Sequence, residues 1–132
     1  MNKQHEESFE KHLVKGGLPC IDVKIKDKNL VFLIDSGSDI SYIDSNIAED
    51  LELPIIEGMT TIVTSIGSQT PESVTYQANI ELSQATLNAN VTGIELRATT
   101  QHLILPFDGI LGVDMLSQIG AEISFSQNKL IY

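Results

Sequence analysis

A run of apolar residues ends directly on a carboxylate in the segment "VFLIDSGSDISYI", residues 31–43. The apolar run Val31–Ile34 predicts a strand that is buried on both faces. Asp35 follows this strand at once, and Ser36 and Gly37 come next. A strand holds such an acid rigidly, and the glycine allows a tight turn and the close approach of another molecule. The fold must therefore present one carboxylate from a buried strand to an accessible loop.

Much of the remaining sequence alternates between apolar and polar residues, which is the period of a β-strand. Ile21, Val23 and Ile25 alternate with polar residues, and "KDKN" supplies turn residues before "LVFLI". Further strands are predicted at "MTTIVTSI", "SVTYQANIELS" and "ATLNANVTGIEL", and the first two form a long hairpin with the polar tip "GSQTPE". A last hairpin is predicted from "AEISFS" and "LIY" around the turn "QNK". The chain is predicted to be mostly β.

Two short helices interrupt this pattern. "DSNIAEDLEL" offers Asp44 or Ser45 as an N-cap and ends before Pro54. The segment "LILPFDGILGVDMLSQIG" is predicted to contain an apolar strand, a tight turn at Asp108 and a short helix that Gly120 ends. Strand-turn-helix units thus recur around Asp35 and Asp108, which indicates a pseudo-symmetric barrel built from two related halves.

Length and composition bound the domain organisation and the partners. The 132 residues fit one domain, predicted at 17–132, and the polar residues 1–16 are expected to form a flexible arm or a frayed helix. A net charge of −10, with only eight Lys and Arg residues, excludes a nucleic-acid phosphate backbone as a favoured partner. No apolar stretch is long enough to span a membrane or to act as a signal peptide, so a cytoplasmic location is expected.

Metal and disulfide chemistry have little support in the sequence. The single cysteine, Cys20, excludes an internal disulfide and is expected to be a buried thiol. The three histidines, His5, His12 and His102, do not have the spacing of a Cys/His zinc site. We therefore expect no metal and no cofactor.

The combination of "FLIDSGSDISYI" and "FDGILGVDML" resembles the retropepsin-like aspartic proteases, the family of retroviral, retrotransposon, cellular and bacterial enzymes. The resemblance extends over residues 17–132 and includes the order of the elements. It implies an acid-protease barrel with one or two short helices. It also implies hydrolysis of peptide bonds by a water held between two aspartates, one acting as base and the other as acid.

The number of acids in this motif predicts the oligomeric state. Only one Asp-Ser/Thr-Gly sequence exists in the chain, at Asp35-Ser36-Gly37, so a monomer holds half of a two-aspartate site. The simplest completion is a two-fold symmetric homodimer in which the Asp35 residues of two copies meet at the axis. Ser36 stands where the family more often has Thr, and it keeps the hydroxyl that the resemblance places across the dimer.

Other residues take roles from the resemblance by position. Asp39 matches the acid that receives substrate backbone amides in retroviral members, with a turn-capping carboxylate as the alternative. Ser38 lies beside it, and a hydroxyl that donates to a carboxylate lowers the carboxylate's pKa, so an acid-shifted optimum relative to Ser38→Ala is expected. The predicted substrate-binding residues are Ser38, Asp39, Ile66, Gly67 and Ser68. The last three fall at the tip of the long hairpin, where the family has its flap and where the alternative is an ordinary exposed turn.

Residues near the second unit are predicted to be structural. Ile110, Leu111 and Gly112 match the family's apolar-apolar-Gly signature, which braces the catalytic loop. Asp108 is expected to cap the turn before Gly109 or to stay at the rim, and Asp114 is expected to be an early-helix acid.

Three functions compete at this stage. The first is a dimeric aspartic endopeptidase that acts on a peptide or protein substrate. The second is a catalytically weak or inactive relative that serves as a dimerisation or peptide-binding module. The third, an unrelated small β-barrel that binds a ligand, does not explain the paired units. The intact Asp35-Ser36-Gly37 favours the enzyme, while the polar hairpin tip is compatible with weak activity.

Overall fold

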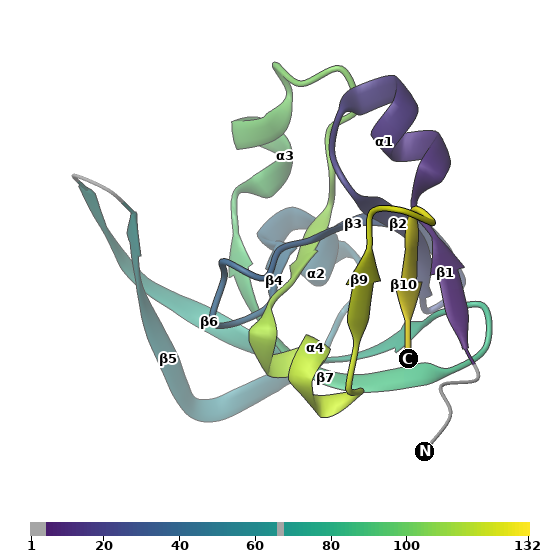
Figure 1. The fold of residues 1–132 in the computed structure, drawn as a ribbon. Helices are drawn as coiled ribbons and strands as arrows, with labels where there is room; N and C mark the ends of the chain where they lie inside the picture. Colours follow the sequence, from purple (N-terminus) through teal and green to yellow (C-terminus); the bar gives the residue numbers. More distant parts are fainter. Residues whose placement is uncertain (1–4, 66–67) are drawn as a thin grey trace.

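The alternating segments of the sequence form a closed six-stranded barrel (Figure 1). The computed structural model describes residues 5–65 and 68–132, with side chains described for 5–57 and 73–132. In spatial order the barrel strands are β2 (Cys20–Ile25), β3 (Lys28–Ile34), β8 (Gly109–Leu111), β4 (Tyr42–Asp44), β7 (Thr86–Ile94) and β6 (Ser68–Glu81), and β2 pairs back with β6. A seventh strand, β5 (Ile55–Ser65), pairs with β6 outside this ring. The mostly β prediction is confirmed.

The β2–β3 hairpin forms as its period-two pattern predicts. Lys26 and Asp27 link the strands with φ values of 49° and 66°, the left-handed conformation that two-residue hairpin turns require. On β3, Phe32 and Ile34 point into the core, while Val31 and Leu33 are half-buried on the opposite face. The strand that carries Asp35 is therefore covered on both faces, which fixes the direction in which it ends.

Four short helices cover the barrel, where one or two were predicted. They are α1 (Glu10–Gly16), α2 (Ser45–Asp50), α3 (Leu96–Thr100) and α4 (Val113–Gln118). α2 begins as expected, because the carboxylate of Asp44 accepts the N–H of Ile47 at 3.3 Å. No helix within the described residues is long and apolar enough to cross a membrane.

Residues 1–16 were predicted to form a flexible arm or a frayed helix, and their described part holds a short strand and the helix α1. β1 (Glu6–Ser8) pairs with β10 (Lys129–Ile131), which pairs with β9 (Glu122–Ser124), and the three strands form a second small sheet. Phe9 follows β1 and is 0% exposed, within the main apolar core. A single aromatic anchor in a polar segment gives no periodic signal, so the pattern alone missed this strand.

The apolar run before Asp108 is also not the strand that was predicted. Leu103–Phe107 is irregular, follows α3, and leaves Ile104 78% exposed. Pro106 has no N–H to donate to a ladder. Phe107 is instead buried in a second apolar cluster on the outer face of the sheet, together with Cys20 and Leu96. The apolar character of this run reflects packing onto that face.

Tyr132, the last residue, gives this fold a pH dependence that can be measured. Its hydroxyl donates to the buried Glu7 at 3.4 Å. Burial, followed by the charge of Glu7, raises the pKa of Tyr132 to about 12, from the ordinary value of 10.0. Between these two values the unfolded chain has lost a proton that the folded chain retains. Stability should therefore fall as pH rises through this window, by roughly 2 to 3 kcal/mol in total.

We expect Tyr132→Phe to remove this part of the alkaline destabilisation. The measurement is the free energy of unfolding in urea at intervals between about pH 9.5 and 12, for the wild type and the variant. The difference between the two curves isolates Tyr132 from the lysines, which both proteins share. Parallel curves across the whole range would contradict the assignment.

Candidate active site

The loop between β3 and β4, residues 35–41, is here called the catalytic loop. The backbone N–H of Asp35 donates to the carbonyl of Leu111 at 3.0 Å, which ties the acid to the neighbouring strand β8. The carboxylate of Asp35 accepts the N–H of Gly37 at 2.9 Å, and the N–H of Ser38 closes a tight turn onto the carbonyl of Asp35 at 3.1 Å. Asp35 is half-buried. The loop thus holds the Asp35 carboxylate in place, with one of its oxygens hydrogen-bonded to the backbone of the loop.

The apolar-apolar-Gly segment lies directly against this loop. Ile110 and Leu111 belong to β8, and the next residue is Gly112. The N–H of Val113 donates to the carbonyl of Ser38 at 2.7 Å, and a Cβ on Gly112 would lie 2.7 Å from that same carbonyl oxygen. Only a residue without a side chain allows the two segments to approach so closely. These contacts are those of a brace for the catalytic loop.

The two strand-turn-helix units correspond differently from the prediction. β3 and β8 run parallel, and their register pairs Ile34 with Leu111. The residue after Ile34 is Asp35, and the residue after Leu111, beside it, is Gly112. Asp108 precedes β8 and does not correspond to Asp35. At this point β3 therefore continues into an acid, and its parallel neighbour β8 continues into a glycine.

A buried hydroxyl supports the far end of the catalytic loop, and no sequence pattern indicated it. Ser41 is 0% exposed. Its hydroxyl donates to Asp114 at 2.7 Å and accepts the N–H of Gly112 at 2.9 Å. Asp114 also accepts the backbone N–H of Ser41 at 3.2 Å and that of Met115 at 2.8 Å. The early-helix position of Asp114 was predicted, but its link across to Ser41 depends on tertiary structure.

Ser38 does not make the contact that the sequence suggested. Its hydroxyl donates to the carbonyl of Ile40 at 2.7 Å, so its single proton is not available to a carboxylate. The expected acid shift of the pH optimum relative to Ser38→Ala therefore loses its basis.

Asp39 is exposed and makes no hydrogen bond with another described residue, so its turn-capping alternative has no support here. Burial raises the pKa of the neighbouring Tyr42, with the charges of Asp39 and Asp114 adding to the effect.

The remaining predicted site residues belong to the long hairpin. Ile66 and Gly67 lie outside the described residues, and Ser68 is the first residue of β6. β5 and β6 pair as the hairpin prediction requires, from Ile55 opposite Tyr76 to Ser65 opposite Ser68. The flap role of these three residues stays a prediction.

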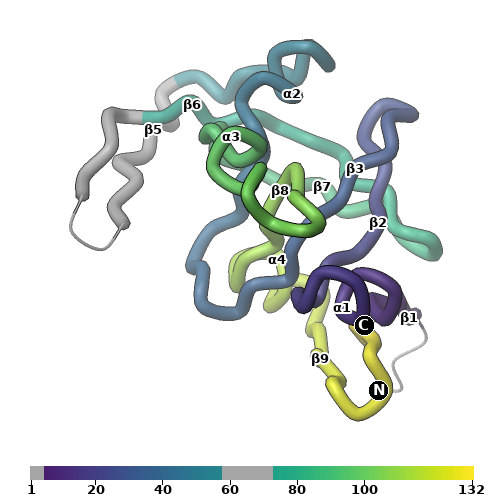
Figure 2. The backbone as a smooth tube through the Cα atoms, turned by 90° about the horizontal axis from the view of Figure 1, so that it is seen from above, coloured from purple at the N-terminus to yellow at the C-terminus, as the bar shows by residue number. Residues whose placement is uncertain are grey.

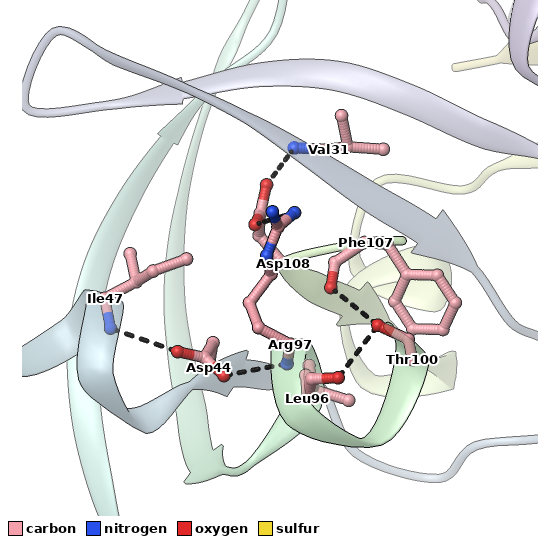
Figure 3. A network of polar contacts seen from close by, with 8 residues as sticks. All are labelled: Val31, Asp44, Ile47, Leu96, Arg97, Thr100, Phe107 and Asp108. Carbon is pink, nitrogen blue, oxygen red and sulfur yellow. Dashed lines mark hydrogen bonds and ion pairs between the residues drawn. The ribbon is translucent and has the colours of Figure 1, made fainter. Parts of the chain in front are cut away.

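Asp108 has the structural role that was favoured, but through different contacts (Figure 3). Its carboxylate accepts the N–H of Val31 at 2.8 Å and pairs with the guanidinium of Arg97 at 3.0 Å. Asp44 lies in the same network and accepts the backbone N–H groups of Arg97 and Ile47. The network joins α3 to β3, the strand that precedes Asp35.

We expect Asp108→Ala to destabilise the protein by about 1–3 kcal/mol, because it leaves the N–H of Val31 without its acceptor. Arg97→Met should cost at most about 1 kcal/mol, since the ion pair is partly open to solvent. Side-chain exposures of 10% for Asp108 and 51% for Arg97 account for this asymmetry. The free energy of unfolding of both variants, measured in urea, checks which substitution costs more. A larger loss for the Arg97 variant than for the Asp108 variant would contradict the assignment.

Cys20 is buried, as predicted, and burial raises the pKa of its thiol to about 11. Such a thiol is a poor nucleophile near neutral pH. Among the described residues, no group of three or more His, Cys, Asp or Glu side chains is arranged to hold a metal ion.

Comparisons with known proteins agree with this geometry. A family model described as "Aspartyl protease" matches residues 21–115. The retroviral protease-like domain of Ddi1 from Leishmania major is 18% identical, with a TM-score of 0.63 over 86% of each chain. EIAV protease, solved with the inhibitor HBY-793, is 22% identical, with a TM-score of 0.57 over 82% of this chain and 93% of its own. Simian foamy virus (mac) protease is 17% identical, with a TM-score of 0.53 over 76% of this chain and 94% of its own. A search of curated proteins found no match.

At these identities the solved structures establish the fold, which is that of retropepsin-like proteins. The family model covers well over half of the chain and includes the catalytic loop and its brace. A strand-borne Asp-Ser-Gly turn, held by β8 and by the glycine after it, is the feature on which sequence, geometry and comparison converge. The chain belongs to the aspartyl protease family.

Proposed function

We propose that this protein is an aspartic endopeptidase whose active site forms between two copies of the chain. The observation that carries the proposal is the pairing of β3 with β8, which puts Gly112, a residue without a side chain, beside the single Asp-Ser-Gly motif at Asp35. One chain thus holds one oriented carboxylate. A second carboxylate in the same environment requires a second Asp35, and a two-fold axis supplies it.

In the proposed reaction, a water molecule lies between the two Asp35 carboxylates. Two carboxylates that both contact one water molecule share one proton, because placing two negative charges so close together is energetically costly. The charged member takes a proton from the water as the water attacks the scissile carbonyl carbon. The protonated member donates its proton to the carbonyl oxygen, which gives a neutral tetrahedral diol and exchanges the protonation states of the two aspartates. As the C–N bond breaks, the newly protonated aspartate gives its proton to the leaving nitrogen, and the charged one takes a proton from a hydroxyl of the diol.

The surroundings of Asp35 suit a peptide substrate. Val31 and Leu33 lie on the outer face of β3, four and two residues before Asp35, and they pack with Ile110 and Tyr42 in the second apolar cluster. An apolar wall beside a catalytic carboxylate can accept apolar side chains of a peptide. The net charge of −10 favours neutral or basic substrates over acidic ones.

The test is digestion of a diverse peptide pool between about pH 3 and 7, with products identified by mass spectrometry. The wild type is expected to cleave internal peptide bonds, and Asp35→Asn, purified in the same way, is expected to leave the pool intact. Equal cleavage by both proteins would point to a contaminant. An intact pool with both proteins, despite a stable dimer, would overturn the proposal in favour of a peptide-binding or dimerisation module.

A further inference from the structure

A groove lies between the N-terminal strand β1 and the outer edge of β2. Its volume is about 540 Å³, and it is lined mainly by residues 6–8 of β1, residues 21–24 of β2 and residues 81–83, where the chain turns from β6 towards β7. Figure 2 shows β1, β2 and this turn on the right of the view, whereas the loop between β3 and β4 lies on the left. The groove is therefore separate from the candidate active site.

One wall of the groove is a strand edge with open backbone groups. The β2–β3 hairpin has a two-residue turn, so its residue pairs alternate regularly between hydrogen-bonded and non-hydrogen-bonded ones. Asp22 and Val31 form a pair without hydrogen bonds, and the N–H of Val31 donates instead to the carboxylate of Asp108. The N–H and C=O of Asp22 therefore point away from β3, towards the groove.

The other neighbour of β2, the strand β6, does not reach these groups. It pairs with β2 only at Lys24 and Glu81, and the same antiparallel register would bring Ser83 opposite Asp22. The N–H of Ser83 donates instead to the buried carboxylate of Glu7 at 2.9 Å, and its hydroxyl donates to the same carboxylate. Ser83 is thus bound to β1 and not to β2. Among the described residues, the edge of β2 is open at Asp22.

The opposite wall, β1, also directs backbone groups away from its own sheet. His5 and Tyr132 exchange both of their backbone hydrogen bonds, each at 2.9 Å. Because successive residues of a strand face opposite sides, the backbone groups of Glu6 and Ser8 then point away from β10. The side chain of Gln84 accepts the N–H of Glu6 at 2.8 Å. Ser8 lines the groove, so donors and acceptors of the backbone are available from both walls.

The groove has more carboxylates than ammonium groups. The residues that line it include one lysine, Lys24, and four acids: Glu6, Glu7, Asp22 and Glu81. Lys129 and Lys11 pair with Glu6 and Asp22 from outside the lining. Glu81 makes no ion pair with another described residue, and it lies on the same face of the sheet as Asp22. Together with the net charge of −10, these acids favour a basic occupant.

We propose that this groove binds an extended segment of another protein that carries Lys or Arg, and that the segment adds to the edge of β2 as an antiparallel strand. One residue of the segment exchanges both backbone hydrogen bonds with Asp22, in the place that a longer β6 would take. The side chain of that residue lies on the same face as Asp22 and Glu81, so a Lys or Arg there meets two carboxylates. This binding goes beyond the proposed protease activity, since it needs one chain and no catalysis.

The first test measures the binding of short blocked peptides to the Asp35→Asn variant by fluorescence polarisation. The probe is a labelled peptide of alternating Lys and Thr. One matched probe has Glu in place of Lys, and another keeps Lys but carries a methyl group on the backbone nitrogen of each Lys. We expect the Lys-Thr probe to bind, the Glu probe not to bind, and the methylated probe to bind at least about tenfold more weakly, because it keeps the charge and loses backbone donors. Equal affinity of the methylated probe, or no binding of the Lys-Thr probe, would overturn the proposal.

A second test locates the binding on the protein. The backbone N–H of Asp22 should exchange its hydrogen more slowly when the Lys-Thr probe is present, as measured by NMR, because the added strand bonds to it. Glu81→Gln should weaken binding of the probe by about two- to fivefold. Glu122→Gln, which removes an exposed carboxylate from β9, is the matched control and should leave the affinity unchanged. Unchanged exchange at Asp22, or equal affinities of the two variants, would count against strand addition at this edge.

Discussion

Replacement of Asp35 by Asn is expected to lower kcat/KM for peptide hydrolysis by about 10²–10⁴-fold, the range typical of a lost general acid–base group. Each dimer loses both carboxylates at once, so no base remains to take the proton from water. The amide of Asn is neutral and does not titrate in the relevant pH range. The measurement is the rate of cleavage of one peptide taken from the pool digestion, with both proteins at equal dimer concentration.

The fold of this variant should be unchanged. The side-chain oxygen of Asn can still accept the N–H of Gly37, the one hydrogen bond that the structure gives to the Asp35 side chain among described residues. Removal of a half-buried charge leaves no buried group without a partner. We therefore expect the same unfolding midpoint and the same dimer affinity as the wild type. Cleavage at wild-type rates by a folded Asp35→Asn dimer would exclude Asp35 as the acid–base group.

Gly112→Ala is expected to have the second largest effect, because it changes the brace and the catalytic loop together. The new Cβ would overlap the carbonyl oxygen of Ile40 and lie 2.7 Å from that of Ser38, both of them backbone atoms. Backbone cannot rotate away as a side chain can, so the loop must move. We expect a loss of about 1–3 kcal/mol in the free energy of unfolding. We also expect a fall of about 10²-fold in kcat/KM, because displacement of a catalytic group by about 1 Å is costly.

Gly16→Ala is the matched control for this prediction. A Cβ at Gly16 would also be crowded, at 3.1 Å from the Cβ of Leu105, but this approach is milder, and a shift of a few tenths of an ångström relieves it. Gly16 is the last residue of α1, where Ala is a better helix former. We expect a change of less than about 1 kcal/mol in stability and no change in kcat/KM. Equal losses in the two variants would contradict a specific role for Gly112.

Alternation along the chain predicted much of the fold correctly. β2, β6 and β7 have one buried face each, so their period of two is visible in the sequence, and β3, covered on both faces, was visible as a continuous apolar run. The turn at Lys26 and Asp27 and the N-cap of α2 followed from local chemistry. Asp35 could be singled out because an acid directly after a buried strand is unusual without a functional reason.

What the sequence did not reveal depends on contacts between distant segments. β1 is held by pairing with β10 at the far end of the chain, and a three-residue strand has too few positions to show a period. The apolar Leu103–Phe107 run was assigned to a strand because periodicity cannot tell a buried strand from an irregular segment on an apolar face. The hydrogen bond from the hydroxyl of Ser41 to Asp114 joins two residues that are distant in the sequence and that only the fold brings together. The apparent match of Asp108 to Asp35 failed for a related reason, because Asp108 precedes its strand, β8, whereas Asp35 follows β3.

The central claim, that two Asp35 residues make one site, is tested most directly by mixing. Wild type and Asp35→Asn are unfolded together, refolded at varied ratios and constant total protein, and assayed with one peptide. If both carboxylates are needed, activity follows the square of the wild-type fraction, and an equal mixture retains roughly one quarter of the wild-type activity. Activity that falls in proportion to the wild-type fraction, with roughly one half retained in the equal mixture, would show that each chain works alone and would contradict the shared site.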